Sequence, residues 1–277
     1  MEQSGLPPVI PESEPERFTV SRWRWGIHLL ILTAYPITLG VLGATLKTGK
    51  GPMLPSDPLQ LAGGIGGEVF IFSVIFGVAI LLSRASMEDL RLRWTSPLAA
   101  VTRGFLYAIG LRIAIGLIAV VAKAMLSVLL GLQPQDIQKL NPDYEQLIDP
   151  NALVNSPFYL WINVTVVSFL LGGLREELWR AGMLSGMAHL APKWFSSVRG
   201  QVFAVCLAAI SFGLGHLTQG WGGVLMTAFL GIGLGLIMVW HRTIWTAVFA
   251  HGFFDAASFL MIYLVTKYRP EWLQQLG

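Results

Sequence analysis

The feature that most constrains this chain is a series of apolar stretches, each bounded by charged residues and close to the ~20 residues that a helix needs to cross a bilayer. Seven such stretches follow one another along 277 residues: 26–46, 61–83, 98–132, 157–173, 200–217, 221–240 and 244–266. Charged residues make up only 13% of the chain and apolar residues 54%, so a soluble domain would lack polar surface. The sequence therefore predicts an all-α, polytopic membrane helix bundle with 7–8 transmembrane helices.

Positive charges are distributed unequally between the connections that join these stretches. One set of connections holds Arg17, Arg22, Arg24, Arg84, Arg91, Arg93 and Arg103, and the other set holds Lys47, Lys50 and Lys139. Short cytoplasmic loops are enriched in Lys and Arg, so we expect a multi-pass protein of the cell (cytoplasmic) membrane with its N-terminus in the cytoplasm. The net charge of +3 is scattered over loops rather than gathered on one face, which argues against nucleic acid as a partner.

Four parts of the chain are expected from this pattern. Residues 1–25 are rich in Pro, Glu and Arg without an apolar run, which predicts a disordered cytoplasmic tail rather than a signal peptide. Residues 26–156 hold the N-terminal transmembrane helices and an external loop, residues 157–266 a membrane core that carries most of the polar motifs, and residues 267–277 a C-terminal tail. The single cysteine, Cys206, excludes an internal disulfide and a thiolate metal site.

Ionisable side chains inside apolar stretches are costly unless they are paired or hydrated, so each one is a candidate for function. For Glu68, Arg112 and Lys123 we expect snorkelling or structural pairing, with the Arg112 end of the third stretch projecting toward the headgroups. Three histidines, His28, His189 and His241, are expected at the interface. The remaining ionisable groups gather between residues 176 and 255.

A pair of glutamates, Glu176 and Glu177, is followed closely by Arg180 in the segment GGLREELWRAG. Arg180 is four residues after Glu176 and three after Glu177, so on a helix it can pair with either carboxylate. The other carboxylate would then be free to take up a proton. The alternative is an ordinary solvated charge cluster in a cytoplasmic loop.

Two histidines lie in the apolar stretches that follow. Phe212 is four residues before His216, so a helix would place the two rings on the same face. His251 and Asp255 have the same spacing, and a carboxylate one turn from an imidazole can fix its tautomer. For each motif alone a structural hydrogen bond is at least as good an explanation, whereas three such segments together favour chemistry.

Together these residues resemble the CPBP group of intramembrane endopeptidases, also called the ABI or type II CAAX prenyl protease family. Its pattern is a Glu-Glu pair followed by Arg, then Phe-x-x-x-His, then His-x-x-x-Asn or Asp, on separate membrane helices. Here the matching residues are Glu176, Glu177, Arg180, Phe212, His216, His251 and Asp255. The resemblance covers about residues 157–266.

One departure from the family pattern concerns the arginine. The family usually has three residues between the second Glu and the Arg, whereas this chain has two, so Ala181 takes the family position. The resemblance favours Glu176 as base and Glu177 as its charged support, and local geometry permits the reverse assignment. The altered spacing also keeps open a non-catalytic membrane scaffold.

The resemblance implies hydrolysis of a peptide bond in a peptide or a membrane-attached protein, including a prenylated protein of the CAAX type. Glu176 and His216 would hold and deprotonate a water, and His251 with Asp255 would donate to or orient the developing oxyanion. No cofactor is required by this scheme. The alternative is a zinc-dependent protease in which Glu176, His216 and His251 are the metal ligands. An ion-coupled transporter is a further alternative, although the chain has no evident internal repeat.

This mechanism requires Glu176 and His216 to lie at a similar depth in the membrane. If the fourth span ended near Gly173, Glu176 would lie at one face of the bilayer and His216 near the other. Convergence requires the segment with Glu176 to continue within the membrane to about Met187, as a broken helix hinged at Gly172 and Gly173.

Overall fold

The computed structural model describes residues 21–45, 52–94, 96–138, 141–195 and 197–269. Over these residues the protein is helical, and β-pairing is limited to one isolated bridge between Leu54 and Ile148. Most of the predicted N-terminal tail and residues 270–277 of the predicted C-terminal tail lie outside the described residues. Within the described part, residues 22–25 of the predicted tail already belong to the first helix.

The helices follow the apolar stretches of the sequence. The long ones are α1 (Arg22–Thr45), α2 (Pro58–Ser83), α3 (Pro97–Leu130), a continuous helix made of α6 (Pro157–Ile162), a π-helical segment (Asn163–Arg175) and α7 (Glu176–Leu190), then α9 (Val198–Leu214), α10 (Gly220–His241) and α11 (Trp245–Tyr268). Short helices connect them: α4 (Pro134–Gln138), α5 (Pro150–Asn155), α8 (Pro192–Phe195) and the 3₁₀ turns Tyr144–Gln146 and Leu217–Gln219.

Six helices in the described part are long and apolar enough to cross a membrane, and α9 adds a shorter apolar helix. The prediction of a polytopic all-α membrane bundle is therefore confirmed. Several helices begin where the sequence places a capping residue before a proline. Asp57, Ser96 and Ser156 each accept a backbone N–H of the following first turn, which has proline at its first position.

The connections that carry most of the arginines lie at one end of the bundle. There, His189 at the end of α7 contacts Asp89 in the α2–α3 connection at 2.8 Å and stacks on Trp25 near the start of α1. In the same connection the carbonyl of Arg91 accepts the N–H of Ile244, between α10 and α11. These contacts place the α2–α3 and α10–α11 connections on the side where α1 begins, as the charge pattern predicted.

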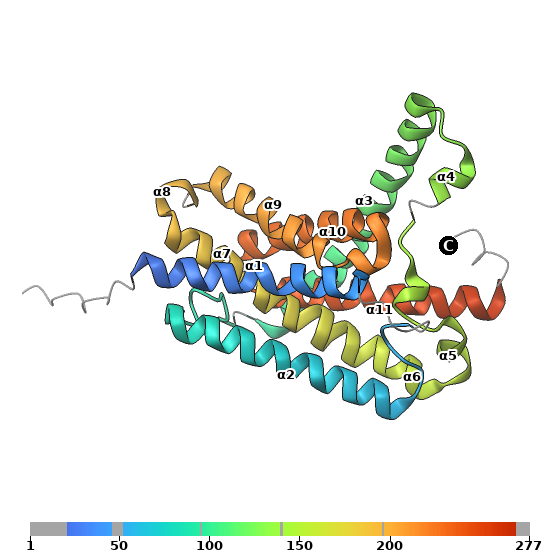
Figure 1. The fold of residues 1–277 in the computed structure, drawn as a ribbon, viewed down its shortest axis with the longest axis horizontal. Helices are drawn as coiled ribbons and strands as arrows, with labels where there is room; N and C mark the ends of the chain where they lie inside the picture. The colour runs from blue at the N-terminus through green and yellow to red at the C-terminus, as the bar shows by residue number, and fades with distance from the viewer. Residues whose placement is uncertain (1–20, 46–51, 95, 139–140, 196, 270–277) are drawn as a thin grey trace, which may run out of the picture.

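The core lies where α7, α9, α10 and α11 meet. Its buried members include Trp179, Phe212, Leu234 and Ala247, and α11 packs both on α3 and on the π-helical segment. Figure 1 shows these helices running along the long axis of the molecule, with α1 beside α7 and α2 beside α1. The residues of the predicted membrane core thus come from the most tightly packed part of the protein.

The long helix α3 does not behave as the sequence suggested. Its C-terminal part stands away from the other helices together with α4 (Figure 1), so the end that projects is the one near Leu130 and not the one that holds Arg112. Arg112 contacts α11 instead, and Lys123 binds the side-chain oxygen of Asn141. Both Arg112 and Lys123 are therefore paired with other side chains, as one of the two expected arrangements.

Of the three histidines expected at the interface, His28 lies in the interior instead, whereas His189 and His241 lie in the last turns of α7 and α10. His28 is fully buried, with its two ring nitrogens 3.0 Å from the carbonyl oxygens of Ala79 and Gly182. His189 contacts Asp89, and the Nε2 atom of His241 lies 3.0 Å from the hydroxyl of Tyr107. No local sequence signal marks these contacts, because each partner comes from a different helix or connection.

Candidate active site

The glutamate pair stands at the junction between the π-helical segment and α7. The helix runs without a break from Pro157 to Leu190, so the predicted hinge at Gly172 and Gly173 is wrong, whereas the predicted continuation of this helix past Glu176 is right. Both glycines instead allow α11 to approach closely. A Cβ on Gly172 would collide with Oδ2 of Asp255, and one on Gly173 would lie 2.8 Å from the carbonyl oxygen of Val248. π-Helical turns are rare and are often found at functional sites.

Glu177 and Arg180 form a buried ion pair. Neither side chain has any exposed surface, and Nη1 of Arg180 donates to Oε1 of Glu177 one turn earlier on α7. The guanidinium of Arg180 also lies 4.7 Å from the ring centroid of Phe212 on α9. The alternative prediction of a solvated charge cluster is therefore wrong for Glu177 and Arg180. The shorter spacing between Glu177 and Arg180 still permits the pair, because residues three apart on a helix are neighbours.

Glu176 has a different set of partners. Nη2 of Arg175 donates to its Oε1 at 2.8 Å, and the other guanidinium nitrogen of Arg175 donates to Glu68 on α2. The Glu176 side chain is 16% exposed, so it is the more accessible carboxylate of the two. The arginine that pairs with Glu176 is thus Arg175, and Arg180 is committed to Glu177.

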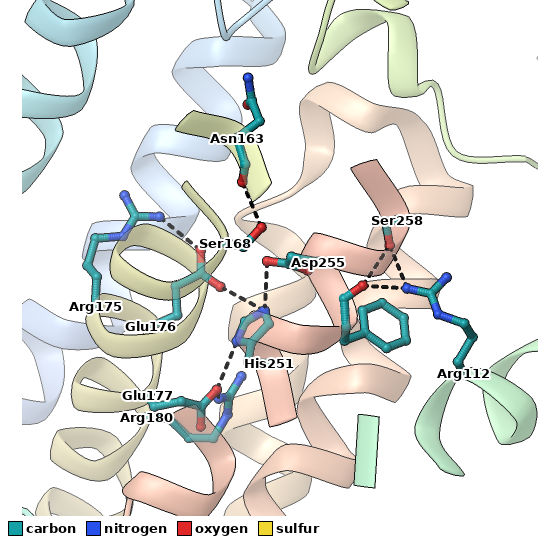
Figure 2. A network of polar contacts seen from close by, with 11 residues as sticks. Arg112, Asn163, Ser168, Arg175, Glu176, Glu177, Arg180, His251, Asp255 and Ser258 are labelled. Carbon is teal, nitrogen blue, oxygen red and sulfur yellow. Dashed lines mark hydrogen bonds and ion pairs between the residues drawn. The ribbon is translucent and has the colours of Figure 1, made fainter. Parts of the chain in front are cut away.

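His251 on α11 lies between three carboxylates, as Figure 2 shows. Its Nδ1 is 3.0 Å from Oε1 of Glu177, a distance at which the ring N–H donates to the carboxylate. Its Nε2 is 3.7 Å from Oε2 of Glu176 and 3.6 Å from Oδ2 of Asp255. The imidazole is only 3% exposed, so its orientation is fixed by these neighbours and by the surrounding helices.

His216 lies just beyond the end of α9, because this helix ends at Leu214. The shared helix face predicted for Phe212 and His216 is thus not formed, yet the two rings still meet edge to face with centroids 4.8 Å apart. Nδ1 of His216 is 2.9 Å from the carbonyl oxygen of Phe212 and donates to it, since a carbonyl only accepts. In the neutral ring Nε2 then carries the lone pair. The Phe212 ring also meets His251 edge to face, with centroids 6.1 Å apart.

The structure thus brings together five of the six predicted site residues directly: Glu176, Glu177, Arg180, His251 and Asp255. The sixth, His216, joins them through the ring of Phe212.

Two members of the network were missed as site residues. Arg175 was not named as a site residue, and for Glu68 only snorkelling or structural pairing was expected. The signal available for Glu68 was its position as the single acidic residue of the second apolar stretch.

The zinc alternative requires three ligands that converge. Among the residues that the structure describes, no group of three His, Cys, Asp or Glu side chains is arranged to hold a metal ion. The chemistry below is therefore derived from the side chains alone.

The comparison with protein families matches residues 157–257 to the family described as type II CAAX prenyl endopeptidase Rce1-like. Over these residues the chain is similar to this family. The matched residues run from the start of α6 to the middle of α11 and contain all six predicted site residues. Comparison with curated proteins and with solved structures finds no match. This match confirms the resemblance indicated by the three motifs. The family is one of endopeptidases, and the chain itself has several candidate membrane spans.

Proposed function

We propose that this protein is an intramembrane endopeptidase that uses a water activated by Glu176. The observation that carries the proposal is the convergence of Glu176 and Asp255 on Nε2 of His251, at 3.7 and 3.6 Å. These distances are too long for direct hydrogen bonds, so the two carboxylates and the imidazole converge here without being bound to one another. A nucleophilic water held beside them would have three polar partners.

Glu176 is the better of the two candidates for the base. Its Oε1 is held by Arg175, and its Oε2 faces His251 and can take the proton of the water as oxygen attacks the scissile carbonyl. Glu177 has no exposed surface and is already bound by Arg180 and His251. It serves as the buried carboxylate that holds the imidazole, in the way a carboxylate orients the histidine of a catalytic triad.

The two histidines would then have different tasks. His216 donates through Nδ1 to the backbone, so its neutral Nε2 can accept a hydrogen bond from the attacking water. His251 donates through Nδ1 to Glu177 and, when protonated, can donate through Nε2 to the oxyanion that forms on the carbonyl. Asp255 orients that N–H. The proton on Glu176 finally passes to the leaving amine.

The substrate class follows from the family and the location of the site. The site lies among helices long enough to span a bilayer, so a substrate held at the membrane by a lipid would reach it with its peptide bond already near membrane depth. We propose a membrane-attached protein terminus of the prenylated CAAX type, in the membrane of the cell with the N-terminus of the chain in the cytoplasm.

Cleavage of paired peptides by the purified protein in detergent or vesicles tests the proposal. The peptides share one sequence and differ only in a prenyl group. We expect Glu176→Gln, His216→Ala and His251→Ala each to lower cleavage about 10²- to 10⁴-fold, the range for removal of an acid–base group. Glu88→Gln, in the exposed α2–α3 connection, is the matched control and should cleave normally.

Four outcomes would change the proposal. Normal cleavage by all three variants, or none by the wild-type protein with either peptide, would refute it. Loss of cleavage with a chelator, restored by zinc, would favour the metal-dependent form with Glu176, His216 and His251 as ligands. Equal cleavage of both peptides would retain the protease and exclude the prenyl group as a determinant.

A further inference from the structure

Arg112 is a charged side chain in the middle of α3, outside the residues that match the family. A lone arginine at this depth in a membrane helix is costly unless it has partners. Its partners all lie on α11. Nη2 donates to the hydroxyl of Ser258 at 2.8 Å and to the carbonyl oxygen of Phe254, as Figure 2 shows, and the guanidinium lies 4.4 Å from the ring centroid of Phe254.

These contacts fall on the turn of α11 that follows His251. The carbonyl of Phe254 also accepts the hydroxyl of Ser258 at 3.0 Å, so Arg112 binds both members of one hydrogen-bonded pair. Asp255 is the next residue after Phe254. Any rotation or sliding of α11 that moved Asp255 away from Gly172 would break the contacts with Arg112.

The charge of Arg112 matters as well as its hydrogen bonds. Each of the three carboxylates around His251 has an arginine: Glu176 is paired with Arg175 and Glu177 with Arg180. The positive charge of Arg112 attracts the carboxylate of Asp255, and it does so from the side of α11 opposite to Glu176. Around Asp255 the charged and titratable groups are His251 on its own helix, Glu176 and Glu177 on α7, and Arg112 on α3.

We propose that Arg112 is a positioning residue for the proposed hydrolysis. Through Phe254 and Ser258 it holds the turn of α11 that carries His251 and Asp255, and its positive charge stabilises the carboxylate of Asp255 that orients His251. The inference rests on the proposed function. It adds to the site a residue from a helix that lies before the segment matched by the family.

The test compares Arg112→Gln, which removes the charge, with Arg112→Lys, which keeps it. A cavity of about 280 Å³ between α3 and α11 already adjoins Arg112, so neither smaller side chain has to be forced into the packing. Arg103→Gln is the matched control, because Arg103 is exposed on the same helix. The measurements are kcat, KM and the pH profile of cleavage of the peptide, together with hydrogen exchange of α11.

For Arg112→Gln we expect kcat to fall at least about tenfold with KM within about twofold, since the cleavage geometry and not the binding surface is changed. The acid limb of its pH profile should also move to higher pH, because the carboxylate of Asp255 loses a nearby positive charge. Exchange at residues 251–258 should rise. Arg112→Lys should retain the wild-type pH profile and recover most of kcat.

A purely structural role predicts another pattern. If Arg112→Gln lowers only the amount of folded protein, with kcat and the pH profile of the folded fraction equal to those of wild type, the inference is overturned while the protease remains. If the wild-type protein cleaves neither peptide, the proposed function fails and the inference fails with it.

Discussion

The first three helices and the long helices after residue 157 are all apolar enough to cross a membrane, but they are used differently. In α3, 6% of the most apolar stretch is buried inside the protein, compared with 44% in the helix Pro157–Leu190. The early helices therefore present most of their side chains outward, where any apolar residue suffices. The later helices surround the polar network and must fit one another. Apolar composition alone does not distinguish a helix that faces lipid from one that builds a site.

The largest expected effect on stability comes from breaking the buried ion pair between Glu177 and Arg180. This pair lies in the half of the molecule formed by the helices after residue 157, which is the more tightly packed half. Arg180→Met would leave Glu177 charged and without its cation, which costs about 3–5 kcal/mol. The double variant Glu177→Gln with Arg180→Met removes both charges and should recover a large part of this loss. Thermal unfolding in detergent measures both variants. A single variant as stable as wild type would contradict the buried pair.

Glycines test the same contrast between the two halves. Gly172→Ala places a methyl group against Oδ2 of Asp255 and 3.7 Å from Nε2 of His251, so cleavage should fall about 100-fold. Gly66→Ala on α2 is the matched control, because nothing lies within 4 Å of a Cβ there. It should leave cleavage unchanged and add about 0.5–1 kcal/mol of stability, since alanine favours a helix over glycine. Equal effects at the two positions would remove the distinction between the halves.

The smallest effect concerns the contact that joins the two halves at one end of the bundle. The hydrogen bond from His189 lowers the pKa of Asp89 in the α2–α3 connection from 3.8 to about 2. Burial acts in the opposite direction but is the smaller effect. A lowered pKa in the folded protein stabilises it above about pH 4, and this contribution is lost as the pH falls toward 2.

Asp89→Asn should therefore lower stability by about 0.5 kcal/mol at pH 6, because the pair is partly exposed, and the difference from wild type should shrink as the pH falls below about 4. Unfolding midpoints measured across this pH range test it. A difference that does not change with pH would show that the ion pair is not its source.

Much of the fold could be predicted from local sequence, because span length, proline positions and capping residues act within a single helix. Asp57, Ser96 and Ser156 mark helix starts in this way. What could not be predicted depends on which helices meet. Nothing near Glu68 indicates Arg175, which lies more than a hundred residues later. The same holds for His28 and the carbonyl of Gly182.

The candidate site shows the same division. Its members were found because ionisable residues are rare in apolar stretches, and the resemblance to a family supplied their order. Their pairing was left open: Arg180 could pair with either glutamate by spacing alone. Packing decides for Glu177, because Glu177 and Arg180 both lie against the core while Glu176 turns toward Arg175. The π-helical turns before Glu176 had no signal in the periodicity of the sequence.

The arrangement of arginines around His251 has a consequence for where the proton must come from. Four carboxylates, those of Glu68, Glu176, Glu177 and Asp255, face three guanidiniums and one imidazole. When the imidazole is protonated this group is electrically neutral. In the proposed mechanism, moving a proton from water to Glu176 leaves the total charge of the group and the water unchanged, so each round of bond cleavage would need no charge from either side of the membrane.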